Sequence, residues 1–228
     1  MMVRRLVALP LLAVLATPAH ARRAYNREPE GQPPRAKTNL WQQILKPHAE
    51  EVAHLLWEGR KLRDEYAANL YEQHQQPQRK KILADAMERF LRAHELDPAD
   101  SGITLELANV AFDVNDWRVA VEAYLAYRQA GEEEKQPYYV LYNLAEAHFR
   151  LRQFEEAAAI LEGGVAESAT WQPADRARAL TLLGHIYMAE NRLDDAVDVY
   201  ARATSVQAYG GGPDYLALFI DIFGTSRT

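Results

Sequence analysis

The sequence contains no cysteine among its 228 residues. Without a thiol, the chain can form no disulfide, no CxxC zinc site, no thiol nucleophile and no lipid attachment through an N-terminal cysteine. An excess of basic residues is also missing, because 26 lysines and arginines stand against 32 aspartates and glutamates, for a net charge of −6. This balance argues against nucleic-acid binding, which requires a basic surface to neutralise phosphates.

An apolar run long enough to cross a membrane is missing too. The run Leu6–Ala16 has eleven residues, whereas a membrane-spanning helix needs about 20. Two arginines precede this run and the small-x-small sequence Ala-His-Ala follows it, so residues 1–21 match a cleaved secretory signal peptide. We therefore predict an exported protein, periplasmic or secreted, with no membrane span in the mature chain. The alternatives are an uncleaved anchor and a short apolar N-terminal helix.

Active-site patterns are absent as well: the chain has no GxSxG, no HExxH, no P-loop and no GxGxxG sequence. His148 and His185 each lack a second ligand at i+4, so neither predicts a metal site. The acidic pair Glu155-Glu156 falls at a helix start, where it favours the helix dipole. We expect no catalytic residue, no metal and no cofactor, and hence no enzyme.

A repeat is the strongest feature that the sequence does contain. Three segments share a leucine, a small residue directly after it, and an alanine twelve positions later. They are LANVAFDVNDWRVAVEAY, LAEAHFRLRQFEEAAAIL and LGHIYMAENRLDDAVDVY, and a partial copy, ADAMERFLRAHELDP, precedes them. The second alanines lie 34, 37 and 39 residues apart. Self-similarity at this period indicates a helical solenoid.

The residue types in the repeat have a physical reason. Each half of a repeat carries apolar residues at i, i+3 and i+4, which predicts one amphipathic helix per half. The small residues Ala108, Ala145 and Gly184 allow the two helices of a pair to approach closely. Turn-forming residues follow the first helix, and Asp116 is placed to cap the second. A single helix pair cannot bury its apolar stripe alone, so the pairs must stack.

The pattern resembles the tetratricopeptide repeat (TPR) family over about residues 77–208. The step Leu144-Ala145, the aromatic Phe154 and the small residue Ala157 carry the resemblance, together with Pro98 at the end of the partial copy. It implies an all-α fold, a right-handed α-solenoid of stacked antiparallel helix pairs. The sequence departs from the family pattern at the second helix-B alanine, and an excess of five residues near 166–175 lengthens one connection.

The predicted organisation follows from these boundaries. After the signal peptide come a disordered basic linker at 22–39 and a degenerate helical pair at 40–97. The repeats occupy 98–208, and a Gly-Gly-Gly hinge with a capping helix occupies 209–228. That helix has apolar residues on two sides, and we predict its outer side as a C-terminal interface. The residues of this interface are Tyr215, Leu218 and Ile222.

The resemblance also implies where a partner binds. In this family the first helices of successive pairs line a concave groove. The groove residues expected here are Asn109, Tyr139, Tyr142, Asn143, Glu146, Arg178, Thr181 and His185. One subclass clamps a C-terminal carboxylate, but this chain has Leu105 and Leu182 where that clamp has cations. An extended or helical segment is the preferred ligand.

The leading functional hypothesis is therefore a non-enzymatic TPR scaffold or adaptor of the cell envelope, which binds a protein or peptide partner through the groove. The alternative is a structural subunit that self-assembles into a homo-oligomer, or joins a larger envelope assembly, through its apolar C-terminal helix.

Overall fold

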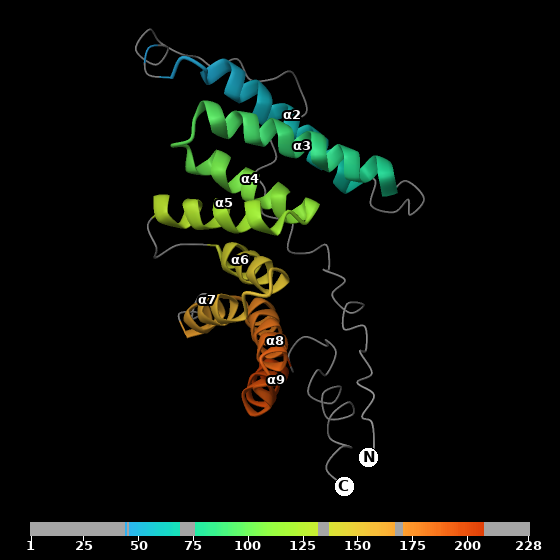
Figure 1. The fold of residues 1–228 in the computed structure, drawn as a ribbon, viewed down its shortest axis with the longest axis vertical. Helices are drawn as coiled ribbons and strands as arrows, with labels where there is room; N and C mark the ends of the chain where they lie inside the picture. The colour runs from blue at the N-terminus through green and yellow to red at the C-terminus, as the bar shows by residue number, and fades with distance from the viewer. Residues whose placement is uncertain (1–43, 45, 69–75, 132–136, 167–170, 208–228) are drawn as a thin grey trace, which may run out of the picture. The chain divides into compact units, whose positions relative to one another are not determined.

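The computed structural model describes residues 44, 46–68, 76–131, 137–166 and 171–207. Its helices form four consecutive pairs and, in the described residues, there is no strand. The pairs are α2 (Ala49–Ala68) with α3 (Gln76–Leu96), α4 (Ser101–Val114) with α5 (Trp117–Ala130), α6 (Tyr138–Arg150) with α7 (Phe154–Ala166), and α8 (Pro173–Ala189) with α9 (Leu193–Gln207). Each helix packs against the next along the chain, and α6 also packs against α8 (Figure 1). The predicted all-α solenoid of stacked helix pairs is confirmed.

A small residue on the first helix faces a large residue on the second helix in every pair. A Cβ atom built on Gly184 would lie 2.4 Å from Cε1 of Tyr200, and one built on Gly59 would lie 2.8 Å from Cζ of Phe90. Such distances are too short for real atoms, so glycine is required for the observed helix spacing. The four pairs are Gly59 with Phe90, Ala108 with Tyr124, Ala145 with Leu161, and Gly184 with Tyr200.

The turns inside the three C-terminal pairs share one main-chain geometry. Asn115, Arg152 and Asn191 occupy the same position and have φ angles of 66°, 62° and 62°. The N–H of the residue that follows each of them donates to a carbonyl five residues earlier, at 2.8–3.0 Å. This is the Schellman arrangement, which closes a helix through a left-handed residue. Asp116 also caps α5 as predicted, because its Oδ1 accepts from the N–H of Val119 at 3.2 Å.

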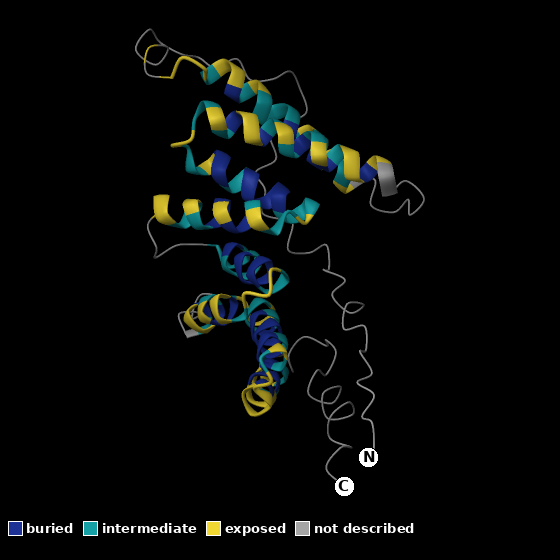
Figure 2. Cartoon of the chain, viewed as in Figure 1, coloured by how far each residue is buried: buried dark blue, intermediate teal, exposed yellow. Residues whose placement is uncertain are grey.

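Helix α6 is buried on two sides. Residues 144–148 are all buried, which no single-faced helix would show. Leu144 belongs to an apolar cluster with Tyr124 of α5, whereas Ala145 belongs to a second cluster with Leu161 of α7. Figure 2 shows the buried colour along α6 and α8, and exposed positions along α5 and α9. Helix α6 therefore joins the two halves of the core.

Several sequence predictions lie outside the described residues. They include the signal peptide, the basic linker, and the C-terminal interface of Tyr215, Leu218 and Ile222. Helices α2 and α3 fall within the predicted segment 40–97, and α4 to α9 fall within 98–208. Among the described helices, none is long and apolar enough to cross a membrane.

The close contact at Gly184 predicts the effect of one added methyl group. Gly184→Ala should lower the free energy of unfolding by about 1–3 kcal/mol, because the ring of Tyr200 is only 2% exposed and has no room to move. Gly163→Ala is the matched control in α7, since a Cβ there meets nothing within 4 Å. It should raise stability by roughly 0.5–1 kcal/mol through helix propensity. Urea unfolding measures both free energies. A Gly184→Ala variant more stable than the native chain would contradict the requirement for glycine at this contact.

Candidate partner-binding face

The residue directly after each small contact residue is polar in all four pairs. These residues are Arg60, Asn109, Glu146 and His185. They occupy equivalent positions on α2, α4, α6 and α8, the first helices of the pairs. We call the side of these helices that carries them the first-helix face.

Buried tyrosines of the second helices hold two of these polar residues in place. The hydroxyl of Tyr124 donates to Oδ1 of Asn109 at 2.8 Å, and the hydroxyl of Tyr200 lies 2.7 Å from Nδ1 of His185. In both pairs the tyrosine follows the polar residue by fifteen positions. The Tyr124 hydroxyl also accepts from Nδ2 of Asn143 at 3.0 Å, which ties α6 to the same site. The polar groups beneath the first-helix face are thus positioned by the core.

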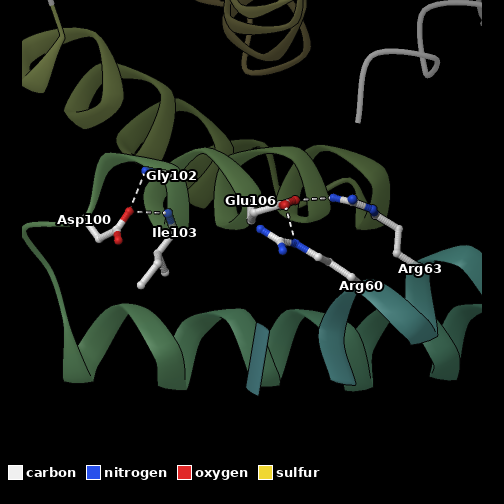
Figure 3. A network of polar contacts seen from close by, with 6 residues as sticks. All are labelled: Arg60, Arg63, Asp100, Gly102, Ile103 and Glu106. Atoms are coloured by element: carbon white, nitrogen blue, oxygen red, sulfur yellow. Dashed lines mark hydrogen bonds and ion pairs between the residues drawn. The ribbon is translucent and has the colours of Figure 1, made fainter. Parts of the chain in front are cut away.

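At the N-terminal end of the face, two arginines of α2 bind one carboxylate of α4 (Figure 3). Nε of Arg60 donates to Oε1 of Glu106 at 2.9 Å, and Nη1 of Arg63 donates to Oε2. Arg63 is only 8% exposed, so this is a largely buried ion pair. Asp100 fixes the start of α4, because its Oδ1 accepts from the N–H groups of Gly102 and Ile103. The network joins α2 to α4 directly.

The sequence prediction does not include this network, because the recognisable repeat begins near residue 77, after α2. The signal was nevertheless present: Gly59-Arg60 has the same small–polar pattern as Ala108-Asn109. The connection between α2 and α3 is longer than those inside the other pairs, so the constant spacing of the repeat is lost in the first pair.

At the C-terminal end of the face, three aromatic rings meet. The ring of Tyr138 lies 5.6 Å from that of Tyr142 and 4.8 Å from that of Trp171, the latter edge to face. Trp171 belongs to the lengthened connection before α8, and it fits because position 164 is glycine: a Cβ there would lie 2.8 Å from the Trp171 ring. Burial raises the pKa of the Tyr138 hydroxyl well above its usual range. The long connection therefore supplies an aromatic wall.

A charged pair stands beside this wall at the start of α8. Nη1 of Arg178 lies 3.9 Å from Oδ1 of Asp175, and the side chain of Arg178 is 35% exposed. Burial raises the pKa of the Asp175 carboxyl, and the charge of Arg178 opposes that rise. Tyr142 and Arg178 are thus both partly exposed, Tyr142 against the ring of Tyr138 and Arg178 beside Asp175.

The predicted groove residues divide into two groups. Tyr139, Tyr142, Asn143, Arg178 and His185 are partly exposed. Asn109, Glu146 and Thr181 were predicted as groove contacts, but they are only 2%, 2% and 9% exposed. The hydroxyl of Thr181 donates to the carbonyl of Ala177 within α8. The sequence pattern gives the helical position of these three residues but not their burial, which depends on contacts with other helices.

A cavity of about 270 Å³ lies away from this face, between α7, α8 and α9. Tyr187 lines it, and its hydroxyl donates to Oε1 of Glu162, while the guanidinium of Arg192 lies 4.1 Å from the centre of its ring. The remaining lining includes Asp198 and Arg202 of α9. Sequence reasoning gave no indication of this cavity. In the described residues, no group of three histidine or acidic side chains is placed to hold a metal ion.

Comparison with known proteins agrees with the repeat pattern. The family model for the tetratricopeptide repeat matches residues 105–170 and again 142–213. Residues 105–213 are tetratricopeptide repeats. Members of this family are generally non-enzymatic scaffolds. No curated protein matches the chain.

Solved TPR structures share the fold at low sequence identity. MamA of MSR-1 matches with a TM-score of 0.57 at 15% identity, over 75% of this chain and 84% of its own. MamA of AMB-1 matches with a TM-score of 0.56 at 16% identity, over 78% and 83%. YrrB, described as a TPR protein with an unusual peptide-binding site, matches with a TM-score of 0.52 at 17% identity, over 82% and 93%. At these identities the likeness establishes the fold alone.

The environment of His185 predicts acid sensitivity. Burial lowers its pKa to about 4 in the folded chain, whereas an unfolded histidine has a pKa of about 6.5. Protonation therefore favours the unfolded state, so stability is complete above pH 6.5 and declines as the pH falls toward 4. The expected loss between pH 7.5 and pH 5.0 is about 2 kcal/mol.

Urea unfolding of the native chain and of the His185→Phe variant is measured at both pH values. The difference between the two proteins gives the contribution of His185 to the loss of stability, because the carboxylates contribute equally to both. The variant should lack the additional loss at pH 5.0. An identical decline in both proteins would show that His185 is not the responsible group.

Proposed function

We propose that the chain is a non-enzymatic scaffold that holds a segment of another protein against its first-helix face. The observation that carries this proposal is the partial exposure of two neighbouring side chains, Tyr142 and Arg178. The ring of Tyr142 contacts that of Tyr138 in the aromatic wall, and Arg178 is near enough for its charge to act on the Tyr138 hydroxyl. Tyrosine and arginine dominate the energetic centres of protein interfaces. Membership of a family of scaffolds supports the same reading.

The preferred ligand is an extended or helical segment rather than a clamped C-terminal carboxylate. Leu182, which takes the place of a clamp cation, is 2% exposed and packs in the core. Asn109, a second clamp position, is directed to Tyr124 instead of to a ligand. A peptide lying across several first helices needs no such clamp. The peptide-binding site of YrrB, on the same fold, is an analogy in favour of this mode.

The scaffold is proposed to act in the cell envelope or outside the cell. The support is the signal-peptide pattern of residues 1–21. The alternative of self-assembly rests on residues 215–223, outside the described residues, and it stays a prediction.

Export predicts a defined mature N-terminus. The exported chain should begin at Arg22, because the Ala-His-Ala sequence before it fits signal-peptidase specificity. Intact-mass measurement of protein from the envelope fraction tests this directly. Retention of residues 1–21 on the exported chain would contradict the cleavage, and recovery only from the cytoplasm would contradict the location.

Partner binding is tested by two matched charge reversals. Arg178→Glu alters the first-helix face, whereas Arg202→Glu alters the cavity between α7, α8 and α9. Each arginine lies within 4 Å of an aspartate of its own helix, at 3.9 Å and 3.6 Å, so the two changes perturb stability similarly. We expect Arg178→Glu to weaken binding at least about tenfold, as loss of a central interface arginine does, while Arg202→Glu leaves it unchanged.

The measurement is affinity purification of the tagged chain from the envelope fraction, followed by titration with the identified partner. The opposite result, with Arg202→Glu as the damaging change, would move the site to the cavity. Absence of any reproducible partner would count against the scaffold role.

A further inference from the structure

One arginine of the first helix pair has no carboxylate partner. Every other arginine of α2 and α3 binds a glutamate side chain. Arg79, in the first turn of α3, forms neither an ion pair nor a hydrogen bond within the described residues. Yet it is only 9% exposed, about as buried as Arg63, whose charge Glu106 neutralises. A buried cation normally has such a partner, so the unpaired Arg79 requires an explanation.

Tyr66 of α2 supports the guanidinium of Arg79 but does not satisfy its hydrogen bonds. The guanidinium carbon lies 4.8 Å from the centre of the Tyr66 ring. A ring attracts a cation to its face, but this contact leaves the five N–H donors of the guanidinium unused. Nε is buried without a hydrogen-bond partner, whereas the two terminal nitrogens, which also lack a partner, are not buried. The terminal edge of Arg79 is therefore open to a ligand from solution.

This guanidinium lies at the end of the pair where α2 stops and α3 begins. Tyr66 belongs to the last turn of α2, which ends at Ala68. Side chains on a helix point back toward its N-terminus, so Arg79 extends toward Gln76, the first residue of α3. The first N–H groups of a helix have no partner within the helix, and the positive end of the helix dipole lies there. A helix start of this kind attracts anions, and Arg79 adds an unpaired charge to it.

Two lysines increase the positive charge at the same place. Lys80 and Lys81 follow Arg79 directly, are exposed, and form no ion pair within the described residues. The first turn of α3 contains no acidic residue. Asp64 and Glu65 of α2 are exposed, but no ion pair in this part of the chain joins them to the three cations. The start of α3 thus carries three adjacent cations without a paired counter-ion.

We propose that the start of α3 binds a phosphate group. The accessible edge of Arg79 can donate to two phosphate oxygens in the forked geometry that guanidinium favours. Lys80 and Lys81 strengthen the attraction from their exposed positions. A phosphate monoester carries a charge of about −1.5 to −2 and three acceptor oxygens, so it matches three cations and a helix start better than a carboxylate does. The site lies on a second helix and is separate from the first-helix face.

The phosphate has two possible sources with the same chemistry, a free phosphate ion and a lipid headgroup. The first experiment titrates the full chain with inorganic phosphate at constant ionic strength and follows the arginine Nε–H signals by ¹⁵N–¹H NMR. Arg79→Gln identifies the Arg79 signal by its loss. We expect this signal to shift and saturate with phosphate, and to respond at least about tenfold more weakly to acetate, which has fewer oxygens and one charge.

The matched control for Arg79 is Arg92, an exposed arginine on the same helix. Arg92→Gln removes the same charge thirteen residues further along α3, about 20 Å away at 1.5 Å per residue. We expect Arg79→Gln to weaken phosphate binding at least about tenfold, and Arg92→Gln by less than about twofold because salt screens that distance. Arg79→Lys keeps the charge but loses the fork, so its affinity should lie between those of Arg79→Gln and the native chain.

Vesicles distinguish the two sources. The full chain and both glutamine variants are sedimented with vesicles of phosphatidylcholine alone or with added phosphatidylglycerol. Sedimentation that needs phosphatidylglycerol and Arg79, but not Arg92, identifies a lipid headgroup. Binding of inorganic phosphate without sedimentation identifies a free phosphate group. Both results support the site.

Three results would overturn it. They are an Arg79 signal that does not respond to phosphate, an equal response to acetate, and equal weakening by Arg79→Gln and Arg92→Gln. The last would show general attraction to a positive surface instead of a site. If circular dichroism shows that Arg79→Gln fails to fold, the native titration and Arg79→Lys decide the result. None of these outcomes depends on the partner-binding test with Arg178→Glu.

Discussion

The close approach of two helices at one small residue is the contact on which the rest of this structure depends. Gly59 and Gly184 leave no space for a methyl group against the rings of Phe90 and Tyr200. This contact sets the spacing within a pair, and the spacing determines how far the second helix projects its large side chain toward the first-helix face.

The same contact explains why polar side chains are buried inside an apolar solenoid. The residue after the small one points toward the first-helix face, and the large residue across the pair reaches the same depth. Where that large residue is tyrosine, its hydroxyl satisfies the polar neighbour, as with Asn109. Where it is leucine, as beside Glu146, the polar atom remains unpaired. The same packing contact therefore leaves some polar atoms hydrogen-bonded and others unpaired.

Differences between the pairs also give the two ends of the first-helix face different side-chain contacts. In the first pair, an ion pair between Arg60 of α2 and Glu106 of α4 takes the place of the tyrosine contact. The lengthened connection before α8 places Trp171 against Tyr138. An exact repeat would present the same surface on every pair, whereas these departures make the α6–α8 region distinct. Specific recognition requires such a distinct region.

The amino-acid sequence alone determined the three C-terminal helix pairs, their small contact residues and the turn at Asn115, because each depends on neighbours within one pair and recurs at constant spacing. The family and the absence of catalytic motifs were likewise readable from it. Only the tertiary structure decided which residues of the first helices are accessible. Asn109 and Glu146 have the helical position of groove contacts, yet each is only 2% exposed in the stacked helices. Burial between pairs depends on contacts distant in sequence, and no local pattern encodes these.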